Sequence, residues 1–210
     1  MPLPELQYLP FDPVERRAGD ERLPAIVFLH GSDEGGDGSA ASLEKVKVHS
    51  LPCLAAAHKL PRVGGRAFPF FVAAPQAPSG WSSETDRIID LLQILVERHG
   101  VDPRRCYLTG VSMGANACWA VAERTPHRFA AIVPVAGHVH DSAPVPTWIF
   151  AGAHDHLFKI EHVKEGVRKL RAAGAEVEFT CDPDAGHDGR RWSEFYARPD
   201  LYEWLLRHRL

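Results

Sequence analysis

The chain has 210 residues, of which 45% are hydrophobic and 24% charged, and its formal net charge is −3. These values are typical of globular proteins and exclude disordered and collagen-like chains, and the length fits one domain, 1–210, around a single core. The absence of a basic stripe argues against nucleic acid as a partner. No apolar run is long enough to cross a bilayer, so we expect no membrane partner either.

The N-terminal residues predict little regular structure. Residues 1–23 are rich in proline and charge, and we interpret them as an N-terminal extension or an edge strand, with the strand near residues 6–9. The first ten residues lack the basic and apolar regions of a secretory signal. The four cysteines are scattered and form no CxxC pair, which indicates buried reduced thiols and favours a cytoplasmic location.

Strands and helices alternate along the rest of the chain. Short apolar runs ending in glycine, proline or polar residues predict strands, and apolar residues at helical spacing predict helices. The predicted strands cover residues 25–31, 68–76, 106–109, 129–137, 146–153 and 177–183. The predicted helices cover residues 43–59 (interrupted by Pro52), 84–99, 115–124 and 160–173, and a closing helix within 193–209 that starts near Pro199.

This alternation predicts the α/β class, with a mostly parallel central sheet and helices on both of its faces. In open parallel sheets, ligands bind beyond the carboxyl ends of the strands. Reactive side chains that directly follow the predicted strands are therefore the candidates for a functional site.

A candidate nucleophile stands where the strand at 106–109 meets the next helix. The segment Gly110-Val111-Ser112-Met113-Gly114 matches G-x-S-x-G in the strand-turn-helix context that this motif requires. Glycine removes the collisions that a sharp turn would cause, and the helix N-terminus favours a developing anion. The alternative is a plain strand-to-helix turn with a capping serine.

An acid and a base follow later strands in the order that this motif predicts. Asp155 comes just after the strand at 146–153, and His187 follows the last predicted strand. His187 would accept the proton of Ser112 and later give it to the leaving group, while Asp155 would orient the imidazole. All three residues should meet at one edge of the sheet.

Two alternatives compete with this assignment. The first is a metal site built from histidines and acids near two strand ends, but no HExxH or comparable spacing supports it and we expect no bound metal. The candidate ligands would be His138, His140, Asp141, His154, Asp155 and His156. The second alternative is that another acid orients His187. The candidates either lie too close to His187 in sequence or follow another strand, and they are Asp141, Asp182, Asp184 and Asp188.

Acyl transfer also requires donors for an oxyanion. We expect these to be the backbone N–H groups of Met113, directly after the nucleophile, and of Ser32, in the glycine-rich loop after the first central strand. A flexible connection is the alternative for that loop. Trp81 and Trp192 are candidate walls of the substrate pocket, and packing in the core or at the surface is the alternative for both.

Several of these segments together resemble one group of the α/β-hydrolase superfamily. They look like compact esterases and peptidases related to poly(3-hydroxybutyrate) depolymerases and feruloyl esterases, from about residue 24 to the C-terminus; the segments are LHGSDEGGDG, LEKVKVHSLPCL, APQAPSGW, LTGVSMGANACW, FAGAHD and DAGHDGRRW. The resemblance implies an α/β-hydrolase fold, carboxylic-ester hydrolysis and the same triad. It implies no cofactor.

The first loop departs from its relatives, which usually read H-G-x-G-E-R-G. Asp33 replaces the second glycine and Gly35 the arginine, and Asp33 and Glu34 near the mouth would repel anionic substrates. The short connection at 138–145 leaves no room for a large lid, so we expect small-molecule esters of small or aromatic acyl groups. Thioester or peptide hydrolysis by the same triad and a catalytically inactive binding protein remain alternatives.

Overall fold

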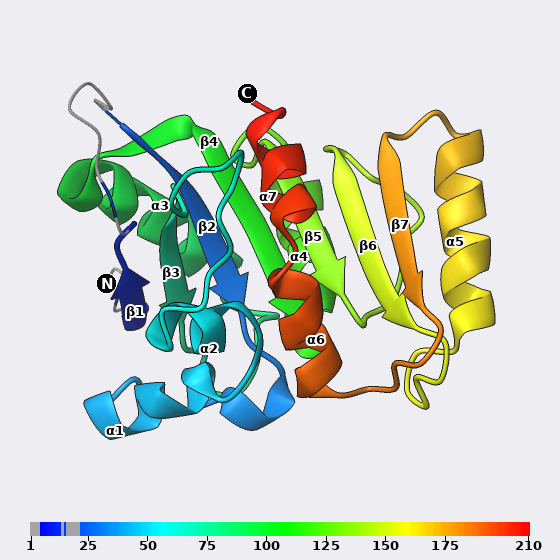
Figure 1. Cartoon of the computed structure of the whole chain (residues 1–210), viewed down its shortest axis with the longest axis horizontal. Coiled ribbons are helices and arrows are strands. Elements are labelled where there is room, and N and C mark those ends of the chain that lie inside the picture. Colours follow the sequence, from blue (N-terminus) through cyan, green and yellow to red (C-terminus); the bar gives the residue numbers. More distant parts are fainter. Residues whose placement is uncertain (1–4, 14, 16–21) are drawn as a thin grey trace.

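The computed structural model describes residues 5–13, 15 and 22–210. Its centre is a seven-stranded sheet in the order β1-β3-β2-β4-β5-β6-β7, in which only β1 runs antiparallel (Figure 1). The strands are β1 (Tyr8–Phe11), β2 (Leu23–Leu29), β3 (Phe71–Pro75), β4 (Val101–Val111), β5 (Ala131–Val135), β6 (Thr147–Gly152) and β7 (Val177–Asp182). The mostly parallel sheet and the α/β class that the alternation predicted are confirmed.

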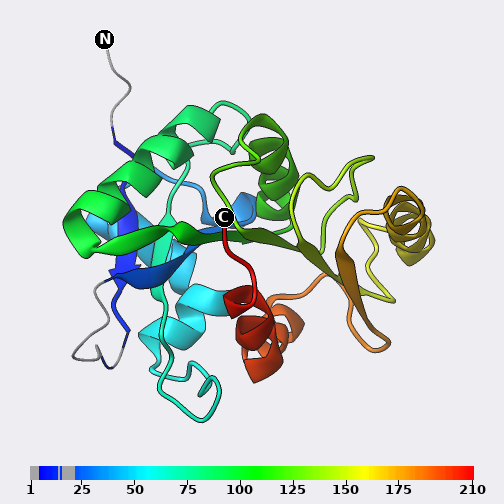
Figure 2. The same cartoon turned by 90° about the horizontal axis from the view of Figure 1, so that it is seen from above.

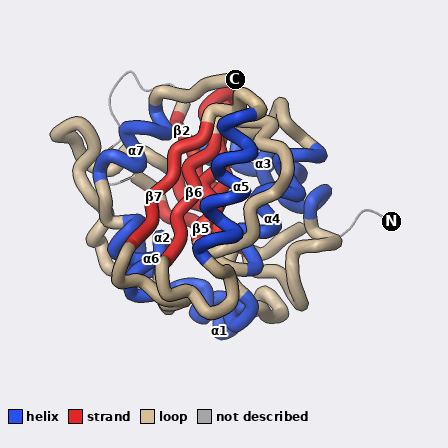
Figure 3. The backbone as a smooth tube through the Cα atoms, turned by 90° about the vertical axis from the view of Figure 1, so that its right-hand side faces the viewer, coloured by secondary structure: helices blue, strands red, loops and turns tan. Residues whose placement is uncertain are grey.

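Helices cover both faces of the sheet, as Figures 2 and 3 show. One face carries α3 (Thr85–His99), α4 (Met113–Arg124) and α5 (Ile160–Ala172). The other carries α2 (Ser50–Ala56), α6 (Gly189–Tyr196) and α7 (Pro199–Leu206). Burial on both sides explains why the central strands are apolar throughout.

The remaining elements are the short helices in and after the loop that follows β2, and the edge strand β1. The loop after β2 contains the short 3-10 helix η1 (Ser32–Glu34), and α1 (Ala40–Leu43) and η2 (Glu44–Lys47) follow it. β1 pairs with β3 at the edge of the sheet and begins two residues later than the predicted strand. Residues 1–4, 14 and 16–21 of the predicted N-terminal extension lie outside the described residues.

Local sequence signals explain two helix ends. Helix α3 ends at Gly100, whose φ of 68° is in the left-handed region that glycine adopts without strain. Pro52 does not break a helix, contrary to the interruption we predicted, because α2 begins at Ser50. Pro52 therefore lies in the first turn, where a backbone N–H has no partner within the helix.

The C-terminal region holds one helix more than predicted. Helix α6 begins directly after Asp188, whose side chain accepts the backbone N–H of Arg191 and so caps the helix. Helix α7 begins at Pro199, as predicted. The connection between β5 and β6 carries neither helix nor strand, so no large lid is inserted there. Within the described part of the chain, no helix has the length and apolar character needed to cross a membrane.

Candidate active site

Ser112 occupies the single residue between β4 and α4. Its φ of 53° and ψ of −113° are unfavourable for a residue with a side chain, and such strain persists only where the surroundings hold it. The Ser112 N–H donates to the carbonyl of Val135, at 2.9 Å, which ties the turn to the end of β5. The structure thus places the serine hydroxyl at the carboxyl edge of the sheet.

Two glycines permit this turn. A Cβ on Gly114 would lie 2.0 Å from the carbonyl oxygen of Leu29, and one on Gly110 would lie 2.6 Å from the backbone of Gly114. Contacts this short with backbone atoms leave no room for any side chain. The first turn of α4 therefore packs directly against the end of β2.

The structure brings His187 and Asp155 to this serine. The Nε2 atom of His187 is 3.0 Å from Ser112 Oγ, and its Nδ1 atom is 2.8 Å from Asp155 Oδ2. Because a carboxylate can only accept, the Nδ1 atom carries the hydrogen and Nε2 is free to accept from the hydroxyl. Both side chains are well shielded from solvent, with 11% of His187 and 1% of Asp155 exposed.

Asp155 is fixed by its own backbone surroundings. It follows β6, and its Oδ1 atom accepts the N–H groups of Leu157 and Phe158 at 2.8 and 2.9 Å. One carboxylate oxygen is thus held by the loop while the other faces the imidazole. This geometry leaves the Asp155 carboxylate little freedom to turn away from His187.

The other acids and histidines of the region have different partners. Asp182 accepts the N–H of Asp184, and Asp188 caps α6, so the contact with His187 is made by Asp155. His138 packs edge-on against Phe158, while His140 stacks on Trp119. No group of three or more potential ligands that could hold a metal occurs among the described residues.

The loop after β2 lies against the serine turn. A Cβ on Gly31 would stand 3.8 Å from Ser112 Cβ, so the start of this loop lies beside Ser112. Buried His30 anchors this loop, because its Nε2 accepts the N–H of Ala77 at 2.9 Å and its Nδ1 donates to the Gly31 carbonyl at 2.6 Å. Burial lowers the pKa of His30, although Gly31 and Glu34 oppose the shift.

The two tryptophans proposed as pocket walls take different places. Trp81 is buried behind the loop, where its Nε1 donates to the His30 carbonyl at 2.9 Å and its ring lies 4.7 Å from the imidazole. Trp192 packs edge-on against His187, with ring centroids 4.8 Å apart. Trp81 thus supports the loop, whereas Trp192 directly contacts the imidazole that faces the serine.

Sequence reasoning missed a buried pair beside this centre. Glu34, which we expected as a charge near the mouth of the site, is buried, and its Oε1 accepts from His49 Nε2 at 3.0 Å. His49 in turn packs edge-on against Trp192 at 5.2 Å. The fifteen-residue separation of Glu34 and His49 matches no local pattern, so no signal in the sequence pairs them.

Comparison with known proteins identifies the family. The model of the dienelactone hydrolase family matches residues 76–190, which is more than half of the chain. The chain belongs to the dienelactone hydrolase family. This family lies within the α/β-hydrolase superfamily that the sequence motifs indicated.

Relatives of this dienelactone hydrolase family member include polymer-cleaving and esterase proteins. Poly(3-hydroxyalkanoate) depolymerase C of Paucimonas lemoignei is 27% identical over 144 residues, which cover 60% of this chain and 31% of the depolymerase. The chain spans only 39% and 31% of the length of the curated relatives it matches. A solved thermostable esterase is 25% identical, with a TM-score of 0.74 over 97% of this chain and 59% of its own. Esterase PE8, at 18% identity, has the same fold with a TM-score of 0.66, over 95% of this chain and 99% of its own.

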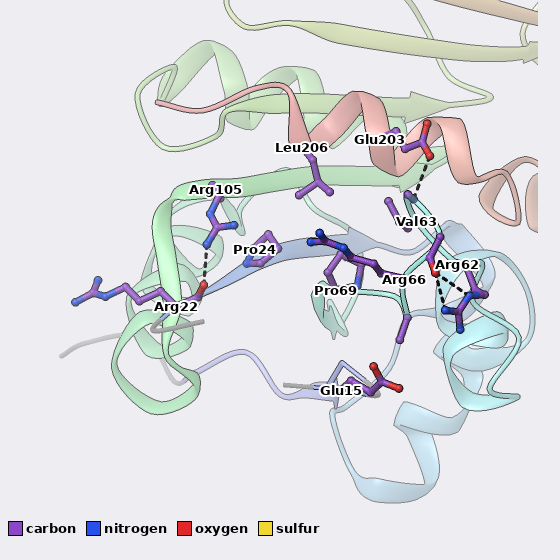
Figure 4. Close-up of a pocket in the computed structure, with 13 residues that line it drawn as sticks. Glu15, Arg22, Pro24, Arg62, Val63, Arg66, Pro69, Arg105, Glu203 and Leu206 are labelled. Atoms are coloured by element: carbon purple, nitrogen blue, oxygen red, sulfur yellow. Dashed lines mark hydrogen bonds between the residues drawn. The ribbon is translucent and has the colours of Figure 1, made fainter. Parts of the chain in front are cut away.

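A cavity lies at the opposite end of the strands from the Ser112 site. It is lined by residues at the amino ends of β2 and β4, including Pro24 and Arg105, and by Arg66 from the loop before β3 (Figure 4). Glu203 from α7 also borders it and accepts the N–H of Gly64. Because parallel strands start at this end of the sheet, the cavity is separated from the Ser112 turn by the length of the strands.

Proposed function

We propose that this family member is a serine hydrolase that cleaves carboxylic esters through an acyl-serine intermediate. The proposal rests on one observation, the continuous hydrogen-bonded path from Ser112 through His187 to Asp155. A serine hydroxyl is a poor nucleophile unless a base takes its proton, and His187 Nε2 lies at hydrogen-bond distance from it. The esterase neighbour and the depolymerase relative support ester hydrolysis as the reaction.

The first half of the reaction transfers the acyl group to the enzyme. His187 Nε2 takes the Ser112 proton while Oγ forms a bond to the carbonyl carbon, and the carbonyl electron pair moves onto oxygen. The N–H groups of Ser32 and Met113 stabilise that oxyanion. When the carbonyl reforms, the bond to the alcohol oxygen breaks and the imidazolium donates its proton to that oxygen.

The second half returns the enzyme to its resting state. His187 takes a proton from water, the resulting hydroxide attacks the acyl-serine, and the acid leaves as Ser112 regains its proton. Throughout both halves, Asp155 accepts from Nδ1 and stabilises the imidazolium. His187 thus takes up and gives back a proton in each half of the reaction, and no cofactor takes part.

The substrates that fit best are small-molecule esters with small or aromatic acyl groups. The short connection between β5 and β6 supplies no apolar cover for a long acyl chain. We expect acetyl and butyryl p-nitrophenyl esters to be cleaved with higher kcat/KM than the palmitoyl ester. A clear preference for the palmitoyl ester would contradict this part of the proposal.

Covalent labelling tests the mechanism directly. A fluorophosphonate probe should label the wild type and fail to label Ser112→Ala. Ser142→Ala is a matched control, because that exposed serine hydrogen-bonds only to Glu123 among the described residues and should not affect labelling. An unlabelled wild type, or labelling that persists in Ser112→Ala, would exclude the proposed nucleophile.

A further inference from the structure

Glu34 holds a buried negative charge beside the reactive serine. Its side chain is 8% exposed, and Oε1 accepts from His49, but Oε2 is buried without a hydrogen-bond partner among the described residues. Burial opposes ionisation, yet the hydrogen bond and charge of His49 lower the pKa of Glu34. The charge of His30 and the backbone N–H of Gly31 contribute less, and that N–H lies near the carboxylate without meeting the geometry of a hydrogen bond. A buried acceptor left unsatisfied is costly and rare in folded proteins.

The unpartnered oxygen lies close to the reaction centre. A Cβ on Gly31 would stand 3.1 Å from Glu34 Oε2 and 3.8 Å from Ser112 Cβ. Because residue 31 is glycine, no side chain occupies that position. The carboxylate oxygen and the nucleophile therefore lie around the same small volume, next to the loop that supplies Ser32.

Glu34 is held in place from two directions. Its backbone carbonyl accepts from Nε2 of buried Gln76 at 2.8 Å, and the same amide nitrogen also donates to the carbonyl of Ser42 at 2.9 Å. His49 fixes the side chain, and the Nδ1 atom of His49 is 2.9 Å from Ser50 Oγ. An acceptor fixed in this way needs no reorganisation when a ligand donates to it.

We propose that the Glu34 carboxylate is a specificity group that accepts a hydrogen bond from a hydroxyl or ammonium group of the substrate, close to the ester bond. This inference rests on the proposed ester hydrolysis and adds the chemical class of the substrate. A site with a buried acceptor discriminates strongly against analogues that lack the donor, because the acceptor then stays unpaired. His49 is a positioning residue that acts through Glu34.

Matched ester pairs test the proposal. For a donor on the acyl group, methyl 3-hydroxybutanoate and the methyl ester of β-alanine are each compared with methyl butanoate. For a donor on the alcohol group, 2-hydroxyethyl acetate is compared with ethyl acetate. In the wild type, at least one donor-bearing ester should exceed its plain partner tenfold or more in kcat/KM. The hydroxyl and ammonium arms show which donor the carboxylate selects.

Variants separate Glu34 from the general charge of the loop. Glu34→Gln should lower the preference at least tenfold, mainly through KM of the donor-bearing ester, and leave the plain ester within about threefold. An ammonium preference should fall further than a hydroxyl preference, since the amide oxygen still accepts but carries no charge. Asp33→Asn, at the exposed neighbouring position, should leave the preference unchanged.

His49→Gln provides a second measurement that does not depend on the folding of Glu34→Gln. The variant should weaken the preference for donor-bearing esters, because the hydrogen bond from residue 49 to Glu34 Oε1 changes. Cleavage of the plain esters should not be abolished. Equal rates for all pairs in the wild type, or an unchanged preference in a folded Glu34→Gln, would overturn the inference. Failure to cleave any ester, with no fluorophosphonate labelling, would instead overturn the proposed function.

Discussion

His30 connects the ends of two neighbouring strands, because its Nε2 accepts the backbone N–H of Ala77 just beyond β3 while the residue itself follows β2. A backbone N–H can only donate, so this nitrogen must stay unprotonated in the folded protein. The loop that carries Ser32 is thus anchored by a neutral imidazole.

Stability should therefore fall as His30 is forced to accept a proton. Its folded pKa is lowered from 6.5, so below that pH the unfolded chain binds more protons than the folded one. The loss begins near the ordinary histidine pKa, grows until the folded pKa is reached, and amounts to about 1.4 kcal/mol for each unit between the two. Urea unfolding of the wild type and His30→Gln, from pH 7.5 to 5, should show the shallower loss in the variant. Glu34, whose pKa is lowered, contributes to acid sensitivity only below about pH 4.5, outside this range.

An equally steep pH dependence in the two proteins would contradict the role of His30. His208, whose pKa burial also lowers, is present in both proteins and so cancels in the comparison. The difference between the two plots of unfolding free energy against pH therefore gives the contribution of the His30 imidazole.

Asp155→Asn should reduce kcat by about 10³- to 10⁴-fold, by analogy with triads in which an amide favours the wrong imidazole tautomer. The two backbone N–H groups that bond Oδ1 can still bond the amide oxygen. Thermal unfolding should therefore change little. Steady-state rates and calorimetry check both expectations, and a loss of less than tenfold in kcat would assign the orienting role to another residue.

Gly114→Ala should prevent correct folding or destabilise the protein by more than about 4 kcal/mol. The new methyl group would lie 2.0 Å from a backbone oxygen of β2, and neither the strand nor the turn can yield without breaking the sheet. Gly186→Ala is the matched control, because its Cβ would have its nearest contact at an ordinary 3.7 Å. Circular dichroism during urea unfolding distinguishes the two, and equal stabilities would show that the turn can relax.

Trp192→Phe should reduce kcat by roughly tenfold, since the smaller ring gives the catalytic imidazole room to rotate. The indole N–H is buried without a partner among the described residues, so no hydrogen bond is lost. We expect a stability loss of about 1–3 kcal/mol from the cavity. Trp204→Phe, which removes the same volume from α7, should cost similar stability and retain kcat. An unchanged kcat in Trp192→Phe would show that the imidazole keeps its orientation without the indole ring.

The sequence predicted the meeting of Ser112, Asp155 and His187 because each follows a strand of one parallel sheet. Strands of such a sheet end at a common edge, so the spatial relationship follows from topology and needs no knowledge of side-chain packing. The burial of Glu34 could not be predicted in this way. It depends on the path of a glycine-rich loop and on a partner that a different segment supplies.

Helix α6 shows a second limit of sequence reasoning. Its apolar residues, Trp192, Phe195 and Tyr196, cover only one side of a short helix that begins with glycine and two arginines. The capping residue Asp188 is the local signal, but it directly follows His187 and was weighed as a rival acid. Packing against β5, β6 and α2 stabilises this helix more than its intrinsic propensity does.

The order of the strands also separates the parts of the Ser112 site along the chain. Strands β4 to β7 lie side by side in the sheet in the order of the chain, and the turn at Ser112 needs only β4 and the end of β5, to which its N–H donates. The imidazole of His187 follows β7, and α6, which carries Trp192, comes after it. A chain that stops before β7 would therefore keep Ser112 without the imidazole that we propose as its base.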